Sequence, residues 1–139
     1  MAGYSKTPLI QKLGLKPGMR ASWMRVPQSV MELLQPLPTD LTLLKTPAKE
    51  MDYVHFFAES IADLEKNFPS LKQSLAKTGT LWISWRKGKN NTDLTDNDVR
   101  RIALEHGLVD VKVCAVDETW SGLKLVYRVK DRSDPPPAK

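Results

Sequence analysis

The alternation of strand and helix patterns constrains the fold of this chain more than any other feature. Runs typical of strands recur as MRASWMRV, LTLL, DYVHFF and TLWISW, and helical patterns separate most of them. Strands that alternate with helices form largely parallel sheets, because a parallel return needs a crossover of about a dozen residues or more. We therefore expect an α/β fold in three layers, with a mostly parallel sheet between helices.

The end of the chain departs from this alternation. Two strand patterns, LVDVKVCAV and GLKLVYRV, are joined by DETWS alone. Because so short a connection fits only an antiparallel pair, the sheet should end in an antiparallel hairpin. By contrast, LTLL and DYVHFF have no helical pattern between them, so those two strands should lie apart in the sheet.

Helical patterns are clearest in the second half of the chain. One apolar stripe, which a helix places on a single face, consists of Ile61, Leu64, Phe68, Leu71 and Leu75. Pro69 lies inside this stripe and should kink the helix or split it in two, and KTG should end it. Thr95 followed by Asp98 resembles a capping box, which predicts a further helix. Shorter helices are expected over 7–13 and after Pro27.

Length and composition indicate one domain. A chain of 139 residues is long enough for a single core, which we place over 1–130. The tail over 131–139 is rich in proline and should be disordered. The single cysteine and the Cys/His spacings predict neither a disulfide nor a metal site, which favours a reducing compartment. No run is apolar over the roughly 18 residues that span a bilayer, so we expect a cytoplasmic chain that contacts no membrane.

The net charge of +5 leaves two interpretations open. Lysines and arginines spread along the chain, and the compact basic cluster is WRKGK at 85–89. A solvated basic surface explains such a charge without any ligand. A nucleic-acid binder needs its cations to converge on one face, and no motif of a known nucleic-acid reader is present, so we do not favour that partner.

Several segments resemble S-adenosylmethionine-dependent methyltransferases. The similar segments are LGLKPGMR before the first strand, MDYVHFF as a middle strand, LKQSLAKTGTLWISW as helix, turn and strand, and the closing hairpin. The resemblance implies a Rossmann-like sheet with strand order 2-1-3-4-6-5, in which strand 6 is antiparallel. More narrowly, LWISW…TDLT followed by GLVDVKVCAVDETWSGLKLV is similar to a family of small bacterial proteins classed only as a domain of unknown function.

The residues that hold the cofactor in such enzymes are missing here. Methyltransferases use a glycine-rich loop after the first strand for the methionine part of the cofactor, and an acidic residue after the second strand for its ribose hydroxyls. Here the first place reads MRVPQSV, where Pro27 lacks a backbone donor and Arg25 occupies space. The second place supplies Lys45 and no acid before Glu50. We therefore predict that no cofactor is bound.

Two polar loops remain as a candidate ligand-binding site. Both should leave the carboxyl edge of the sheet, where α/β folds bind ligands. The candidate residues are Trp85, Arg86, Lys87, Asp93, Asp117, Glu118 and Trp120. Their cations, with Lys89, would neutralise an anion, a tryptophan would stack on it, and the acids would orient it. The alternative is structural: the acids cap a helix or solvate a turn, and the tryptophans pack against helices.

No catalytic residue is predicted. His55 lies in a strand, either as a partly buried histidine with satisfied hydrogen bonds or facing a helix, and Cys114 has the spacing of a small core residue. We expect a non-catalytic methyltransferase-like module that binds a protein partner or a small anionic ligand. Two alternatives stay open: an enzyme with an unusual site between the 85–93 and 117–120 loops, and weak nucleic-acid binding through a basic patch.

Overall fold

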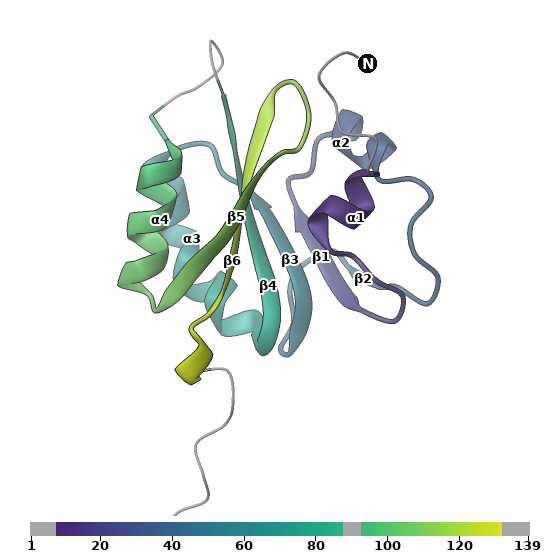
Figure 1. Cartoon of the computed structure of the whole chain (residues 1–139), viewed down its shortest axis with the longest axis horizontal. Coiled ribbons are helices and arrows are strands. Elements are labelled where there is room, and N and C mark those ends of the chain that lie inside the picture. The colour runs from purple at the N-terminus through teal and green to yellow at the C-terminus, as the bar shows by residue number, and fades with distance from the viewer. Residues whose placement is uncertain (1–7, 88–92, 132–139) are drawn as a thin grey trace, which may run out of the picture.

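The computed structural model describes residues 8–87 and 93–131 of the chain. Helices and strands alternate until the last two strands, as expected (Figure 1). The elements are α1 (Leu9–Leu13), β1 (Arg20–Met24), α2 (Gln28–Leu33), β2 (Thr42–Leu44), β3 (Met51–Phe57), α3 (Ile61–Ser74), β4 (Leu75–Arg86), α4 (Asp96–Glu105), β5 (Leu108–Ala115), β6 (Trp120–Tyr127) and the short 3-10 helix η2 (Val129–Asp131).

The strands form one sheet of six strands in the order β2-β1-β3-β4-β6-β5. β1 pairs in parallel with β2 and with β3, and β3 pairs in parallel with β4. β6 is antiparallel to both β4 and β5, so the sheet ends in a hairpin. The strand order implied by the methyltransferase resemblance is confirmed. β1 separates β2 from β3, as the missing helical pattern between them indicated.

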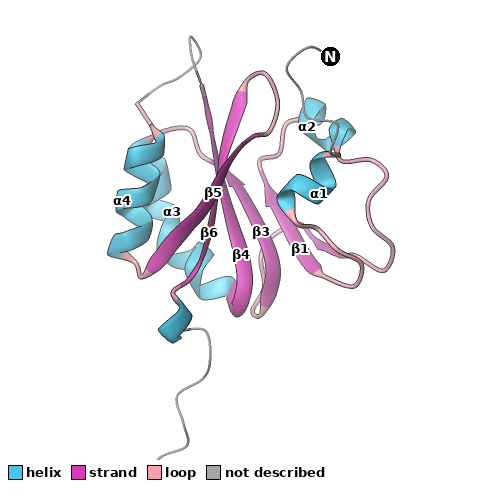
Figure 2. Cartoon of the chain, viewed as in Figure 1, coloured by secondary structure: helices cyan, strands magenta, loops and turns pink. Residues whose placement is uncertain are grey.

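Helices lie on both faces of the sheet and form two separate apolar cores (Figure 2). On one face, α3 and α4 pack over the central strands, and Phe68 and Ile102 are fully buried there. On the other face, α1 and α2 pack over Trp82 of β4, and Val30 of α2 is fully buried in this core. The indole Nε1 of Trp82 donates to the carbonyl of Leu13 at 2.9 Å, which ties α1 to the centre of the sheet. The predicted three layers are therefore present.

The two helical layers differ in extent. α3 and α4 have 14 and 10 residues, whereas α1 and α2 have 5 and 6. The short helices lie over the β1 side of the sheet and do not cover β5 and β6 (Figure 1), so that much of β5 is exposed and Lys124 and Val126 of β6 are half-buried. We call this outer part of the sheet the open face. Its side chains are Thr78, Thr80, Lys112, Lys124 and Val126.

Local signals set the helix starts. Ser60 Oγ accepts a hydrogen bond from the Asp63 N–H at the start of α3. The predicted capping box of α4 is formed, because Thr95 and Asp98 each accept from the other's backbone N–H. α3 runs through Pro69 as one helix, so the helix is not split there.

The boundary between α3 and β4 differs from the prediction. Leu75, predicted on the helix, begins β4, and KTG lies inside the strand, so the predicted turn is wrong. Leu75 pairs with Met51 of β3. A Cβ atom added to Gly79 would lie 2.5 Å from the Met51 carbonyl oxygen. The glycine is needed for this close approach of two strands and not for a turn.

Two further expectations concern the chain's surroundings and its end. No helix in the described part of the chain is both long and apolar enough to cross a membrane. Of the predicted disordered tail, Asp131 ends η2, and the remainder lies outside the described residues.

Candidate functional site

The turn after β1 has an unusual backbone. Arg25, the first residue after the strand, has a φ of 64°, in the left-handed region that favours glycine. Pro27, two residues later, is the N-cap of α2 and contributes no N–H donor, and the helix itself begins at Gln28. The turn that carries glycines in the methyltransferase resemblance is thus made here by an arginine in a strained conformation.

The Arg25 side chain folds back over the end of the sheet. Its guanidinium lies 5.0 Å from the centre of the Phe56 ring, and Nη1 donates to Asp63 Oδ2 at 2.5 Å. Asp63 also accepts from the Glu59 N–H at 3.0 Å and from Asn67 Nδ2 at 3.1 Å. This carboxylate therefore has donors on several sides and fixes the position of the guanidinium.

The ionisation of this pair follows from its contacts. The hydrogen bond to Asp63 raises the pKa of Arg25. Burial alone would raise the pKa of Asp63, but the donors Arg25 and the Glu59 N–H outweigh it, so that pKa lies below its ordinary value. Both groups stay charged at neutral pH, and the ion pair persists.

A second arginine lies at the same edge of the sheet. Arg86 ends β4, forms an ion pair with Glu59, and places its guanidinium 4.8 Å from the centre of the Trp120 ring. Trp120 is buried and meets Phe57 edge to face, with 5.1 Å between ring centres. Two arginine–carboxylate pairs thus line the edge where β1, β3 and β4 end.

The structure brings some of the predicted site residues together. Arg86 and Trp120 are register partners, and the Lys87 N–H donates to the Thr119 carbonyl at 2.9 Å. Asp117 Oδ1 accepts from the N–H groups of Thr119 and Trp120, at 2.8 Å and 2.7 Å, and so shapes the β5–β6 turn. The end of β4 and this turn therefore lie side by side, as expected.

Other predicted site residues lie elsewhere. Trp85 is buried in the core under α3 and α4, on the opposite face of the sheet from Trp120, so the two indoles do not flank one crevice. Asp93 Oδ1 accepts from the Ile61 N–H at 2.9 Å and so holds the start of α3. Glu118 is exposed, and its carboxylate has no partner among the described residues. Lys89 lies outside the described residues. Ligand binding by the predicted set stays a prediction.

Sequence reasoning missed one buried polar chain. Tyr53 Oη lies 2.9 Å from His55 Nδ1, and His55 Nε2 lies 2.7 Å from Ser84 Oγ. Burial lowers the pKa of His55 to about 3, so the imidazole is neutral, and it stacks on Phe57 with 4.4 Å between ring centres. The alternation of Tyr53 and His55 placed them on one face, but only the pairing of β3 with β4 brings Ser84 to them.

This polar chain is structural in its present geometry. A serine and a neutral histidine at hydrogen-bond distance resemble the start of a nucleophilic pair. However, Ser84 and His55 have no exposed surface and Tyr53 has 1%, so no substrate reaches them. Both ring nitrogens of His55 are hydrogen-bonded, as the first of the two expectations had it, but the residue is completely buried and not partly buried.

Comparisons with solved structures agree with this fold. The chain is similar to ribosomal protein L11 methylase from Lactobacillus delbrueckii subsp. bulgaricus, with a TM-score of 0.58, 13% identity, and coverage of 86% of this chain and 75% of that chain. It is similar to a SAM-dependent methyltransferase from Aquifex aeolicus, with a TM-score of 0.59, 12% identity, and coverage of 84% and 86%.

A third similar structure is the complex between the Haloferax volcanii Trm112 methyltransferase activator and the putative methyltransferase, with a TM-score of 0.63, 10% identity, and coverage of 86% and 88%. No family model and no curated protein sequence matches the chain. Identities this low show the fold alone. The chain therefore has the Rossmann-like fold of methyltransferases, and the narrower bacterial family stays a prediction.

Proposed function

We propose that this chain is a methyltransferase-like module that transfers no methyl group and acts by binding a partner or a small anionic ligand. The observation that carries the proposal is the position of Arg25. In open α/β sheets, ligands bind at the carboxyl ends of the strands, where the strand order reverses. In the order 2-1-3 that point lies at β1. Arg25 follows β1 directly and occupies this corner with its own guanidinium.

The turn around Arg25 supports the proposal further. A glycine turn lets the backbone approach an anionic or polar ligand and presents N–H groups to it. Here Arg25 carries a side chain anchored on Asp63 and Phe56, and Pro27 removes one donor. A ligand that entered the corner would have to displace an ion pair and break its hydrogen bonds.

The end of β2 also lacks what a nucleoside would need. β2 ends at Leu44, and the next residue, Lys45, is exposed and carries a positive charge. A carboxylate accepts hydrogen bonds from ribose hydroxyls, whereas a lysine ammonium only donates. Two separate requirements of the cofactor are therefore unmet at neighbouring strand ends.

The enzyme alternative receives less support from the same edge. Asp117, three residues before Trp120, accepts two backbone N–H bonds and holds the turn. Arg86 is paired with Glu59, and Trp85 lies in the other core. No acid and base are thus placed together among these described side chains.

The proposal is tested by methyl transfer and by thermal unfolding with S-adenosylmethionine. A ligand at about one hundred times its dissociation constant adds roughly 2.7 kcal/mol, which raises the Tm of a domain this size by several degrees. We expect no such shift and no labelled methyl group on protein or nucleic-acid acceptors, under conditions in which an active methyltransferase gives both. Turnover above the background of an Arg86→Ala, Asp117→Ala double variant would overturn the proposal.

A further inference from the structure

The charges of this chain are unevenly distributed. Among residues 8–87 and 93–131, the cation of every ion pair is an arginine. The arginine charges are thus largely balanced by neighbouring carboxylates. The lysines in the same part of the chain form no ion pair with a described carboxylate, so the positive surplus lies with them.

Four lysines gather on and beside the open face. Lys112 on β5 and Lys124 on β6 are direct cross-strand partners on the same side of the sheet. The pKa of Lys124 is lowered by its burial and then by the charges of Lys112 and Lys16. Burial raises the pKa of Cys114, the next β5 residue that points to this side, and the charges of Lys12, Lys112 and Lys87 lower it. We call Lys12, Lys16, Lys112 and Lys124 the lysine face.

No carboxylate of the surrounding strands balances these charges. Residues 8–19, which carry Lys12 and Lys16, contain neither aspartate nor glutamate. The acid of β5, Asp110, pairs in register with Leu125, whose side chain points into the core under α3 and α4, and its carboxylate binds Arg100. Two like charges directly opposite each other destabilise a sheet, so this arrangement is unfavourable unless an anion lies on it.

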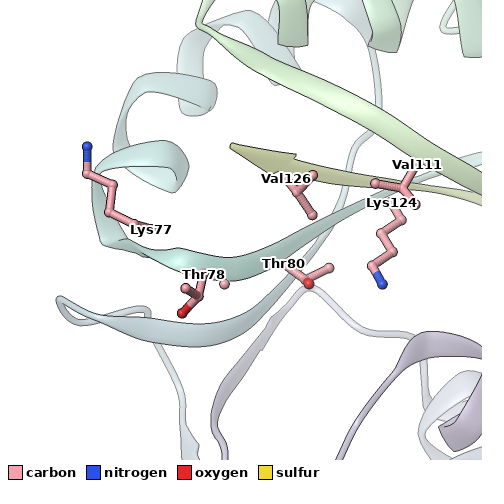
Figure 3. A pocket seen from close by; sticks show the side chains of 7 residues that line it. Lys77, Thr78, Thr80, Val111, Lys124 and Val126 are labelled. Carbon is pink, nitrogen blue, oxygen red and sulfur yellow. The ribbon is translucent and has the colours of Figure 1, made fainter. Parts of the chain in front are cut away.

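The open face is hollowed beside Lys124. A hollow of about 330 Å³ lies between β4, β6 and β5, and Thr78, Thr80 and Val111 contribute to its wall. Lys124 and Thr80 point to the same side of the sheet, whereas the Lys77 side chain points away from them (Figure 3). Ammonium and hydroxyl groups are among the side-chain donors that proteins use on phosphate oxygens.

We infer that the lysine face binds the phosphate backbone of a nucleic-acid duplex without reading its sequence. A protein partner fits less well, because lysine is depleted in protein–protein interfaces and aromatic residues are enriched. Single strands fit less well because they are held by exposed aromatic rings, and all four tryptophans of the chain are buried. This inference is independent of the proposal that Arg25 occupies the ligand position at the end of β1, since it concerns a different surface.

The location differs from the basic cluster WRKGK of the sequence. Arg86 in that cluster is paired with Glu59 and stacks on Trp120, and Lys89 lies outside the described residues. Lys87 of that cluster also acts on the pKa of Cys114, but the four lysines of the lysine face come from α1, the following segment, β5 and β6.

Salt dependence gives a quantitative test. The full chain is titrated with a labelled duplex DNA of about 20 base pairs at several salt concentrations, and binding is followed by fluorescence anisotropy. Each phosphate neutralised contributes about −0.9 to the slope of log affinity against log salt, so four lysines predict about −3.6. The affinity should then fall roughly 150-fold between about 50 and about 200 mM salt. A duplex RNA arm shows whether the helix form matters.

Variants locate the contact. Lys112→Gln with Lys124→Gln should reduce the slope to about −1.8, because two phosphate contacts are lost. The matched control is Lys66→Gln, an exposed lysine on α3 in the opposite layer, which should leave the slope unchanged. Equal Tm values of wild type and variants show that the fold is retained, and the removal of a like-charge pair should not lower the Tm.

Three results would overturn the inference. The first is the absence of duplex binding at low salt, and the second is a slope that Lys112→Gln with Lys124→Gln leaves unchanged. The third is tighter binding of single strands or of polyglutamate than of the duplex, because it would assign the surface to another partner. None of these results bears on methyl transfer, so the failure of this inference and the failure of the proposed function are distinguishable.

Discussion

Replacement of Arg25 by alanine and by glycine separates the two features of this residue, its strained backbone and its anchored side chain. Both variants lose the pair with Asp63 and the contact with Phe56. The Arg25 side chain is 47% exposed, so the ion pair contributes about 0 to 1 kcal/mol, and the contact with the ring contributes about 0.5 to 1 kcal/mol. Only glycine also relieves the positive φ, which costs an L residue roughly 1 to 2 kcal/mol.

We expect Arg25→Ala to lower the free energy of unfolding by about 1 to 2 kcal/mol. Arg25→Gly should retain roughly 0.5 to 1 kcal/mol more than Arg25→Ala, since the greater freedom of glycine in the unfolded chain offsets part of the relief. Urea unfolding at neutral pH measures both differences, and a change of 1 kcal/mol corresponds to roughly 2 to 5 °C in Tm for a domain of this size.

Arg101 is the matched control for this pair of variants. It is also an arginine in exposed ion pairs, but it lies inside α4, where the backbone is helical. There the order should reverse, with Arg101→Gly less stable than Arg101→Ala by about 1 kcal/mol. If Arg25→Gly proves no more stable than Arg25→Ala, the backbone at that turn is not strained, and the argument that an arginine replaces a glycine turn fails.

Further predictions concern the core. The pKa of His55 is about 3 in the fold and about 6.5 in an unfolded chain, so its contribution to stability is full above about pH 6.5 and is lost as the pH falls toward 3. In a denaturation series from about pH 7 to about pH 4, His55→Gln should lose less of its free energy of unfolding than the wild type. An equal dependence of stability on pH in both proteins would contradict the assignment. Ser84→Ala removes one hydrogen-bond partner of the buried His55 and should lower the free energy of unfolding, measured by chemical denaturation, by about 1 to 3 kcal/mol. An unchanged free energy of unfolding would mean that this hydrogen bond contributes nothing to stability. Gly79→Ala places a Cβ against the Met51 carbonyl oxygen and should lower the free energy of unfolding by about 1 to 3 kcal/mol. Thr78→Ala, at an exposed neighbouring position, is the control and should lower it by less than about 0.5 kcal/mol. Equal Tm values for these two variants would contradict the close approach of β3 and β4 at Gly79.

The closing hairpin and the separation of β2 from β3 were accessible from the sequence because each obeys a local constraint, whereas the full strand order was implied by the methyltransferase resemblance. DETWS is too short for a parallel return, and the stretch after LTLL is too polar and broken for a helix, so few arrangements remained. The boundary of α3 was not accessible in the same way. Leu75 continues the helical period of Leu64 and Phe68, and a single apolar residue fits either a helix end or a strand start. Only its pairing with Met51 decides the matter.

The candidate site was harder to predict, because side-chain direction depends on register. Trp85 and Arg86 are neighbours in β4 and therefore point to opposite faces, but the sequence does not say which face is which. The lysine face depends on an irregularity in the pairing. A register shift between Asp110 and Lys112 sets Lys112 opposite Lys124; without it, Lys112 would face the core side with Leu123.

The closure of the ligand position at the end of β1 could be inferred from the sequence only in part. The absence of glycine between Met19 and Leu34 and the presence of Lys45 were visible in the sequence, and they argued against the cofactor. The partner of Arg25 was not visible, because Asp63 lies 38 residues further along the chain and its position in the first turn of α3 reads as an ordinary helix start. Long-range ion pairs of this kind follow from the fold and not from spacing.

In the proposed function, Arg25 closes the ligand position at the end of β1. The most direct test of this closure is a calorimetric titration of the wild-type chain with S-adenosylhomocysteine, which reports binding without any need for turnover. Because the Arg25 guanidinium is held by Asp63 and Phe56 at the end of β1, we expect no saturable heat where an active methyltransferase gives a complete binding curve. A saturable one-to-one curve that Asp63→Ala alters would contradict this reasoning, because the corner would then admit the ligand despite its arginine.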